Sequence, residues 1–458
     1  MKKIIYILIA AFLITSCIDI KLEDQFSDPD AITTIDTARD LLADAYGSFP
    51  QYQLEFSILG DDFVPTSLAA KNVYSLNMYN WVDKSIADFS YNVWGDYYMV
   101  LAQLNALIQR FDMVVTDGEG EVAELDAIKG EAYALKAKCY FDLLRIYAPA
   151  WSAQTKDADA IVLKDILELQ FLPRSSLEKS VVEVERLLDL AGQTVNAETE
   201  VFWLSSDAVN YLKAEVALYK GEYDKVITIL EPYIDGIESH WTETSYKNLW
   251  TDSDSDERIF APYIFSSYYY NDLSYDSLTG DYFCLSPDLT WNEDDIRAES
   301  HYFEFTINGR TVNQFGKYNK MYYDKITVRY VNMMRYSSIC FMAAESYART
   351  GKETEARNLL NLFLNAWHAD VVEETVTGDK LIESILAQKH KELLGEGLNW
   401  FDLKRLGKPI VIMDTWGSRV AKTIPANDYR WLFPIPPSEY KYNDFMTQNP
   451  EWPMEKVQ

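Results

Sequence analysis

The sequence predicts a mostly α-helical protein of paired, repeating helices with a loop-rich aromatic lobe, and three observations support this fold class. Long stretches carry apolar residues at helical spacing. Two of these stretches share one helix–glycine–helix pattern. A further region, about residues 236–332, has no sustained helical period and is rich in Tyr, Trp, Asn and Asp. We expect a single domain over residues 34–458, with this region as its lobe.

Helices are expected from residue 34 onward. In the first, Thr34 or Asp36 can accept a hydrogen bond from the free N–H groups of the opening turn. A later helix opens with Ser175-Ser176-Leu177-Glu178, a spacing typical of a capping box. Apart from the repeats, the helical patterns cover residues 34–49, 90–111, 121–147 and 175–191.

The repeated pattern occupies residues 205–234 and 333–367. With Gly221 and Gly351 aligned, "AEVALYKGEYDKVITIL" matches "AESYARTGKETEARNLL" in its Ala-Glu start, its glycine, its polar turn and its apolar second helix. This pattern resembles the tetratricopeptide repeat, in which each helix pair buries one face against a neighbour. A chance helical hairpin could imitate one such unit, but the shared glycine position favours a repeat.

The remaining segments do not repeat. Residues 50–90 and those after 408 also lack a sustained helical period. Because a structureless run of the lobe's length is uncommon, we expect short strands within it, for example "YFEFTING" and "KITVRYV". The closing residues 431–452 contain X-Pro steps, which favour extended backbone and tight turns in a packed cap.

The N-terminus reads as a targeting segment. A basic start is followed by twelve mostly apolar residues, Ile4 to Thr15, too few to span a membrane but typical of a signal peptide. The sequence "ITSC" then resembles the lipobox of bacterial lipoproteins. We therefore expect a signal peptide at residues 1–16, a lipid on Cys17 and an anchored tether over residues 17–33. The alternative is an ordinary signal peptide in which Cys17 is incidental.

The charge limits the partners. The formal net charge is −29, and removing the signal peptide with Lys2 and Lys3 makes it −31. Such an excess of carboxylates argues against nucleic acid, whose binding depends on cationic neutralisation. It also disfavours an acidic membrane surface. The net charge does not argue against neutral ligands.

Neither a metal site nor an enzyme is indicated. Cys139, Cys284 and Cys340 cannot all pair, and the apolar helical patterns around Cys139 and Cys340 predict buried free thiols. The four histidines lack metal-ligand spacing. Alternate aspartates at residues 252–256 have calcium-loop spacing without the required Gly and Glu, which favours a solvated acidic turn. No catalytic motif occurs, so we predict no catalytic residue, metal or cofactor.

Ordered segments across the chain carry a family resemblance. They are the lipobox, "RSSLEKSVVEVERLLDLA", "MMRYSSICFMAAESYARTGKETEARNLLN", "ILAQKHKELLGEGLNWFDLKRLGK" and "WLFPIPPSEYKYNDFMTQNPEW". Together they resemble the SusD-like (SusD/RagB) outer-membrane lipoproteins. The chain departs from the family pattern at Lys389-His390, where Glu-Arg is usual, at Asn399, where Arg is common, and at Glu451, where Gly is usual. In "GEGLNWFDLKRLGK", Trp400 should pack, while Asp402 and Arg405 should belong to a local charge network.

The resemblance implies a function. Members of the family bind nutrients at the cell surface as partners of a TonB-dependent, SusC-like transporter of the outer membrane. It therefore implies a non-catalytic lipoprotein that captures oligosaccharides and delivers them to that transporter. The alternatives are a peptide-binding lipoprotein of the same kind, a surface glycosidase, and a purely structural assembly protein.

Two aromatic stretches are candidates for the ligand site, because rings match the apolar faces of sugars. Residues 71–85 offer Tyr74, Asn77, Tyr79 and Trp81. Ligand aromatics in the family often come from the loop before the "W..YY" helix, which points to Trp81 and Tyr79. Trp94 and Tyr98, in that helix, are expected to pack. The second stretch, residues 263–291, offers Tyr269, Tyr275, Tyr282 and Trp291, although loop packing is the simpler role for each single ring.

Overall fold

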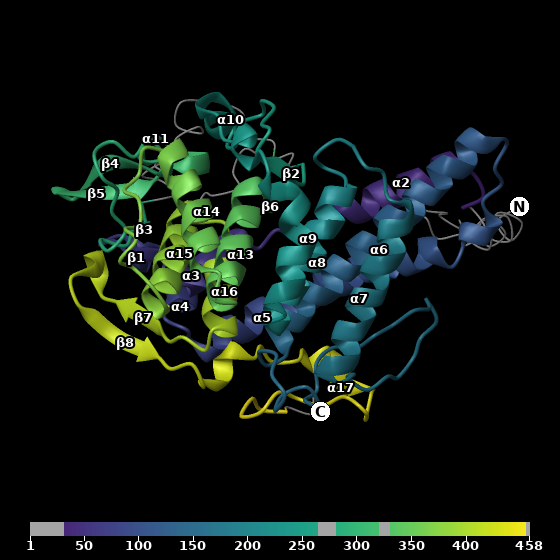
Figure 1. Cartoon of the computed structure of the whole chain (residues 1–458). Helices are drawn as coiled ribbons and strands as arrows, with labels where there is room; N and C mark the ends of the chain where they lie inside the picture. The colour runs from purple at the N-terminus through teal and green to yellow at the C-terminus, as the bar shows by residue number, and fades with distance from the viewer. Residues whose placement is uncertain (1–31, 264–280, 320–329, 455–458) are drawn as a thin grey trace, which may run out of the picture.

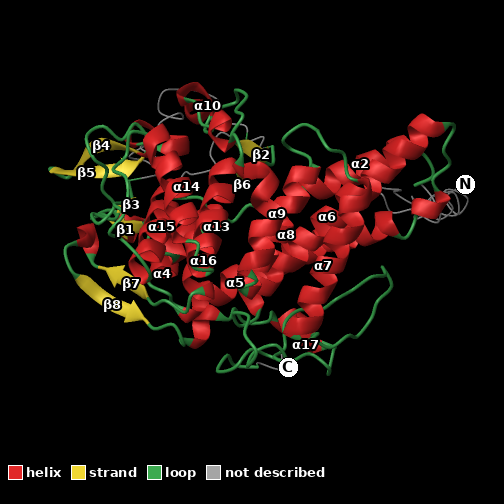
Figure 2. Cartoon of the chain, viewed as in Figure 1, coloured by secondary structure: helices red, strands yellow, loops and turns green. Residues whose placement is uncertain are grey.

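The computed structural model describes residues 32–263, 281–319 and 330–454. Helices make up most of this chain, and the strands within the described residues form four two-stranded antiparallel sheets. Helices α2, α6 and α7 occupy one end of the molecule, and strands β4, β5, β7 and β8 gather at the other (Figures 1 and 2). The predicted mostly α-helical class is confirmed.

The long helices outside the repeats are α2 (Ile35–Gly47), α5 (Asp83–Ile108), α6 (Glu119–Tyr147) and α7 (Leu177–Thr194). Thr34 caps α2 as predicted and accepts from the N–H of Thr37. The N-cap of α7 is Ser176, which accepts from the N–H of Lys179, so this cap lies one residue later than the Ser175–Glu178 spacing predicts. Helix α6 packs closely on α7 and the residues that follow it. A Cβ at Gly130 would lie 2.5 Å from the backbone nitrogen of Val195, so this approach requires glycine.

The prediction for residues 50–90 missed three helical segments. Helix α3 (Gln53–Leu59) and helix α4 (Val73–Tyr79) lie there, and α5 begins at Asp83 instead of residue 90. Helix α3 is buried on nearly all sides, so it has no amphipathic period for a sequence reading to detect. Helix α4 is only seven residues long and is capped by Asn72, whose side chain accepts from the N–H of Ser75.

The two repeats form as predicted. They are α8 (Ser206–Lys220) with α9 (Tyr223–Ile234), and α13 (Tyr336–Arg349) with α14 (Glu353–Ala366). Gly221 (φ 74°) and Gly351 (φ 78°) take the left-handed conformation that ends the first helix of each pair. Helix α13 packs against α9, α8 and α15 (Asp379–Glu392), so the pairs stack on one another.

The sheets lie mainly in the lobe. Strand β1 (Phe63–Pro65) pairs with β3 (Phe283–Leu285), β2 (Arg258–Phe260) with β6 (Met334–Arg335), β4 (Tyr302–Ile307) with β5 (Arg310–Phe315), and β7 (Ile410–Met413) with β8 (Val420–Ile424). The predicted strand "YFEFTING" is β4 with its turn at Asn308–Gly309, whereas most of "KITVRYV" lies outside the described residues.

Short helices complete the described chain. They are η2 (Ala69–Lys71), η3 (Phe111–Met113), η4 (Ile237–His240), α10 (Glu243–Asn248), α11 (Ala298–His301), α16 (Asn399–Arg405), η6 (Thr415–Gly417), η7 (Tyr429–Trp431) and α17 (Pro437–Lys441).

The closing segment, residues 431–452, covers the ends of α5 and α6 as the predicted cap. The Asn449 amide donates to the carbonyl oxygen of Tyr147 at 2.9 Å, and Ser90 Oγ donates to the carbonyl oxygen of Pro434 at 2.6 Å. Phe433 is fully buried among the rings of this region. The C-terminal residues therefore complete a core that is built mostly by the first third of the chain.

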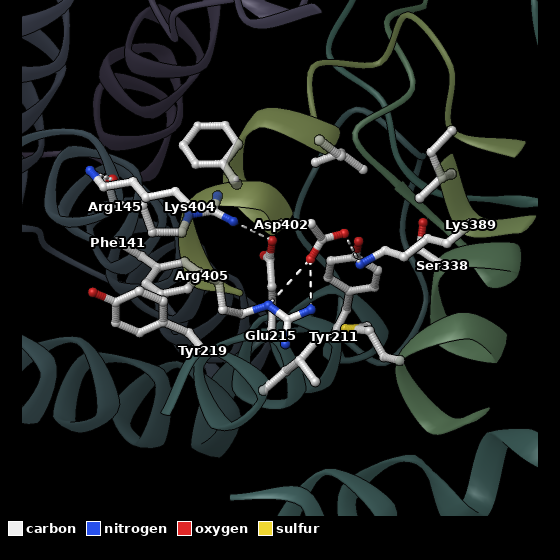
Figure 3. Close-up of a pocket in the computed structure, with 15 residues that line it drawn as sticks. Phe141, Arg145, Tyr211, Glu215, Tyr219, Ser338, Lys389, Asp402, Lys404 and Arg405 are labelled. Atoms are coloured by element: carbon white, nitrogen blue, oxygen red, sulfur yellow. Dashed lines mark hydrogen bonds and ion pairs between the residues drawn. The ribbon is translucent and has the colours of Figure 1, made fainter. Parts of the chain in front are cut away.

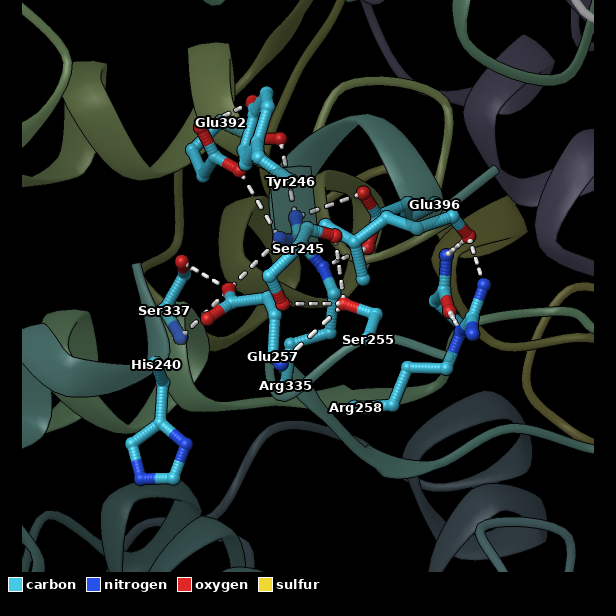
Figure 4. Close-up of polar contacts among 12 residues, drawn as sticks. His240, Ser245, Tyr246, Ser255, Glu257, Arg258, Arg335, Ser337, Glu392 and Glu396 are labelled. Atoms are coloured by element: carbon cyan, nitrogen blue, oxygen red, sulfur yellow. Dashed lines mark hydrogen bonds and ion pairs between the residues drawn. The ribbon is translucent and has the colours of Figure 1, made fainter. Parts of the chain in front are cut away.

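A buried charge network joins the lobe to the repeats (Figure 4). The Arg335 guanidinium, at the junction of β6 and α13, donates to Glu257 at 3.1 Å, to Glu392 at 3.0 Å and to Glu396 at 2.9 and 3.0 Å. Lys317 donates to Glu396 at 2.6 Å. Burial raises the pKa of Glu257 to about 7, although the charge of Arg335 opposes the shift. The network ties together segments as far apart as residues 257 and 396.

The cysteines of the described chain, Cys139, Cys284 and Cys340, are buried and free, which confirms the prediction for Cys139 and Cys340. Burial raises the pKa of each thiol, that of Cys284 to about 12. Cys17 and the predicted signal peptide lie outside the described residues. Within the residues that are described, every helix is too short or too polar to cross a bilayer.

Candidate ligand-binding site

The structure corrects the expectation of a ligand platform at Trp81 and Tyr79. Their rings are only 1% and 2% exposed, so neither can stack on a ligand here. The Trp81 indole donates to the carbonyl oxygen of Leu59 at 2.9 Å. The Tyr79 hydroxyl accepts from the N–H of Met413 at 2.9 Å and donates to its carbonyl oxygen at 3.0 Å. The Trp81 contact ties the end of α4 to α3, and the Tyr79 contacts tie it to β7, because the polar atoms of both rings find backbone partners.

Other members of the first aromatic stretch behave differently. Tyr74 is 45% exposed on α4, and Asn77 is half-buried one turn later. Trp94 is buried in α5, and the Tyr98 hydroxyl donates to the carbonyl oxygen of Val162 at 2.8 Å. The prediction that Trp94 and Tyr98 pack is confirmed.

The second stretch is only partly described. Tyr269 and Tyr275 lie outside the described residues. Tyr282 and Trp291 are both half-buried. The Trp291 ring lies 5.1 Å from the ring of Tyr302, and the Lys391 ammonium lies 5.5 Å from its centroid. Trp291 is thus held beside α15 with part of its surface accessible.

Next to Trp291 lies a surface pocket with an empty volume of about 940 Å³. Helix α15 forms one side of it, and β1, β7 and the loop after β3 form the others. Aliphatic side chains and short polar side chains share the lining. The lining residues are Asp61, Phe63, Val64, Ser286, Asp288, Leu289, Thr290, Ala387, Gln388, His390, Lys391, Val411 and Met413. A second pocket of about 680 Å³ adjoins it along α15, because Asp61, Ala387 and His390 line both.

A charged group lies where the two pockets meet. His390 Nε2 donates to Asp62 Oδ1 at 2.7 Å and lies 3.8 Å from Asp61 Oδ1. Burial alone would lower the pKa of His390, but the hydrogen bond to Asp62 and the charges of both aspartates raise it to about 9. The imidazolium therefore persists at neutral pH.

Among the described residues, Asp61, Asp62 and His390 are also the group of three side chains whose spacing suits a metal ion. Their atoms already have partners. Asp62 Oδ2 accepts from the N–H of Gly395 at 3.1 Å, and Asp61 Oδ1 accepts from the Asn399 amide. These contacts make the group an ion pair that anchors α15 to the segment before β1.

The ion pair involves two of the residues that depart from the family pattern. His390 and Asn399 both bond the Asp61–Asp62 pair, and the Lys389 ammonium lies 2.6 Å from Asp402. The replacements at Lys389, His390 and Asn399 therefore each have a charged or polar partner in this chain.

We expect the stability that His390 contributes to depend on pH. Its pKa is raised from 6.5 in the unfolded chain to about 9, so the contribution is fully present below about pH 6.5 and is lost as the pH rises through 9. His390→Gln should lower the free energy of unfolding by about 2–3 kcal/mol at pH 6 and by much less at pH 10. Urea unfolding of both proteins at the two pH values measures this. An equal loss of unfolding free energy at pH 6 and pH 10 would show that His390 stabilises the fold by packing and not by its charge.

A third pocket, of about 590 Å³, lies between the repeats and α16 (Figure 3). Its charged side chains bond one another: Arg405 lies 2.8 Å from Asp402, Arg145 lies 2.5 Å from Glu215, and Lys404 donates to the carbonyl oxygen of Arg145 at 2.7 Å. Trp400 is fully buried beneath them. This confirms the predicted charge network and packing residue, and it leaves this pocket a part of the scaffold.

The comparisons with known proteins agree with this fold. The model of the SusD family matches residues 227–452, and the model described as "Starch-binding associating with outer membrane" matches residues 19–218. A SusD-like protein of Formosa agariphila is 23% identical to this chain over an alignment 481 residues long. The alignment covers 89% of this chain and 91% of the relative.

Solved structures show the same fold. A SusD-like carbohydrate-binding protein from Bacteroides vulgatus superposes with a TM-score of 0.75 at 19% identity, covering 90% of this chain and 97% of that one. A SusD superfamily protein from Bacteroides thetaiotaomicron gives 0.75 at 22% identity, covering 92% and 100%. The two family models together match nearly the whole sequence, the relative and the solved structures agree with them, and the chain therefore belongs to the SusD-like family.

Proposed function

We propose that this protein is a cell-surface lipoprotein that binds oligosaccharides and delivers them, without chemical change, to a TonB-dependent SusC-like transporter of the outer membrane. The observation that carries the proposal is the pocket of about 940 Å³ between α15 and the lobe. The family descriptions of starch binding and outer-membrane association support the ligand class and the location.

The pocket has the chemistry that a sugar requires. Aliphatic walls such as Val64 and Val411 match the C–H face of a pyranose ring, while Asp288, Thr290 and Gln388 can bond its hydroxyl rim. Tyr74, Asn77, Tyr282 and Trp291 are proposed as further contacts, because each is at least partly accessible. Tyr269 and Tyr275 remain proposed contacts from the segment outside the described residues.

Anchoring follows from the predicted lipid on Cys17. A lipid there would hold the folded chain at the outer membrane through the tether of residues 17–33. In this proposal the paired helices face the transporter. The acidic surface leaves neutral glycans favoured over anionic ones, since like charges repel.

We expect weak binding, as a protein that passes its cargo on requires. A ring that covers about 50 Å² of ligand contributes roughly 1 kcal/mol. A few such contacts, less the cost of immobilising the sugar, give dissociation constants on the order of tens of micromolar to millimolar.

The test is to fill the pocket. Ala387 is exposed on α15 and lines both adjoining pockets, so Ala387→Trp should block the site without disturbing the core. Calorimetry with malto-, cello-, xylo-, laminari- and manno-hexaose should show binding of at least one sugar to the wild type. The variant should bind that sugar at least about tenfold more weakly.

Lys380→Trp is the matched control, because Lys380 is exposed on the same helix and lines neither pocket. Its affinity should equal that of the wild type. If Ala387→Trp bound the sugar as tightly as the wild type does, the ligand site would not be this pocket. If the protein bound a tryptic peptide mixture and none of the sugars, the peptide-binding alternative would be correct. If it cleaved a sugar and one carboxylate substitution abolished the cleavage, the protein would be an enzyme.

A further inference from the structure

The turn between β7 and β8 places a tryptophan in a backbone conformation that suits glycine. Trp416, in η6, has φ 70° and ψ 10°, inside the left-handed region. A bulky side chain there is a genuine outlier and costs roughly 1–3 kcal/mol. Nothing in the sequence around Trp416 distinguishes this residue.

The surrounding contacts determine the shape of this turn. Asp414 Oδ1 accepts from the N–H of Ser418 at 2.9 Å, and the carbonyl oxygen of Asp414 accepts from the N–H of Gly417 at 2.9 Å. Gly417 sits so close to the lobe that a Cβ would lie 2.7 Å from Cδ of Pro287. The turn is held firmly enough to keep a strained residue in place.

The Trp416 side chain does little packing. It is half-buried, and within the described residues its ring lies against no other aromatic ring. Its indole N–H has no hydrogen-bond partner among those residues and is not among the buried polar atoms. By contrast, Trp81 and Trp400 are buried almost completely. The strain at Trp416 is therefore not offset by burial of the ring in the core.

Polar groups from the β4–β5 hairpin lie beside this ring. The Arg310 guanidinium carbon is 5.3 Å from the Trp416 centroid. Arg310 is exposed, and its guanidinium has no ion pair or hydrogen bond with the described residues. Asn308, exposed at the hairpin turn, donates to Ser67 Oγ at 2.8 Å, which holds the hairpin close to the end of β1. A stacked guanidinium keeps its N–H edges available to a ligand.

The turn also lies at the rim of the proposed sugar pocket. A Cβ at Gly417 would be 3.3 Å from Cγ1 of Val64, and Val64 lines that pocket. Met413, which also lines it, is three residues before Trp416 in the chain.

We propose that Trp416 is a sugar-stacking residue of the binding site and that Arg310 donates hydrogen bonds to hydroxyls of the same sugar. The inference rests on the proposed function and extends it to a residue at the rim of the pocket. An indole face matches the C–H face of a pyranose, and an arginine beside it supplies donors. The backbone strain is kept because it presents the ring outward.

The proposal predicts opposite effects on stability and binding. Trp416→Gly relieves the strained φ, so the melting temperature should stay equal or rise. The same variant should bind the hexasaccharide that the wild type binds about tenfold more weakly. Trp416→Phe keeps an aromatic face and should bind within about threefold of the wild type. Differential scanning fluorimetry and calorimetry measure the two effects.

Glu451→Gly is the matched control, because Glu451 is exposed and has φ 66°. It should also keep or gain stability, while affinity stays at the wild-type value. Wild-type affinity in Trp416→Gly would overturn the inference and leave the proposed function intact. A clear loss of stability would assign the ring to packing and overturn it as well. Failure of the wild type to bind any sugar would instead remove the proposed function, and this inference with it.

Discussion

Replacing Arg335 with leucine should lower the free energy of unfolding by about 3–5 kcal/mol, because removing one partner of a buried ion network leaves the others uncompensated. Glu257, Glu392 and Glu396 all bond this guanidinium. Arg335 is 1% exposed, so water cannot replace the lost charge. The loss should appear in urea unfolding at pH 7 and should shrink at low pH, where the carboxylates are protonated.

Arg186→Leu is the matched control. The Arg186 side chain is 52% exposed, and its partner Glu183 lies 2.7 Å away on the same helix face. The Glu183 side chain is 16% exposed, but water reaches the arginine of this pair, so the pair contributes about 1 kcal/mol or less and the control should unfold nearly as the wild type does. A loss below about 1 kcal/mol in Arg335→Leu would mean that the buried carboxylates find other partners, and the network would not be what joins the lobe to the repeats.

Gly395→Ala should be the second most damaging change, with a loss of about 2–4 kcal/mol. Gly395 has φ 74°, where an L-side chain is strained by about 1 kcal/mol or more. Its new Cβ would also lie 2.3 Å from Cζ of Phe315, a ring with no exposed surface into which to move. Forcing a methyl group into a packed core adds about 1–3 kcal/mol.

Gly407→Ala separates these two causes. Gly407 has φ 61°, but a Cβ there would meet no atom within 4 Å. It should therefore show the backbone cost alone, and the difference between the two variants in thermal or urea unfolding measures the clash with Phe315. Equal losses would show that the ring yields and that only the backbone conformation matters.

The helices were largely predictable, because their information is local. Thr34 caps where the sequence places it, the cap of α7 lies one residue from its predicted place, and Gly221 and Gly351 mark the turns of the two repeats. Helix α3 was not predictable, since burial on nearly all sides removes its polar face. The sequence shows a helical period of apolar and polar residues only where one face of the helix is exposed to water.

The candidate site was less predictable, because a pocket brings together residues that are distant in sequence. Asp61 and His390 meet across more than three hundred residues, and no spacing rule connects them. The aromatic count in residues 71–85 was a real signal, but composition does not distinguish Tyr74, which is exposed, from Trp81, which is buried. Trp416 carried no signal in the sequence, because its backbone angle becomes visible only in the structure.

The capping of α5 and α6 by residues 431–452 has a consequence for how the chain folds. The hydrogen bonds between Tyr147 and Asn449 and between Ser90 and Pro434 join residues about three hundred positions apart. Both must form before this core is complete. Contacts of such long range slow folding. A chain leaving the ribosome would thus stay open until its last residues emerged. In the export that we propose, this delay would keep the chain unfolded during translocation. Loss of residues 439–458 would remove the Asn449 contact and leave the core incomplete and open to proteases.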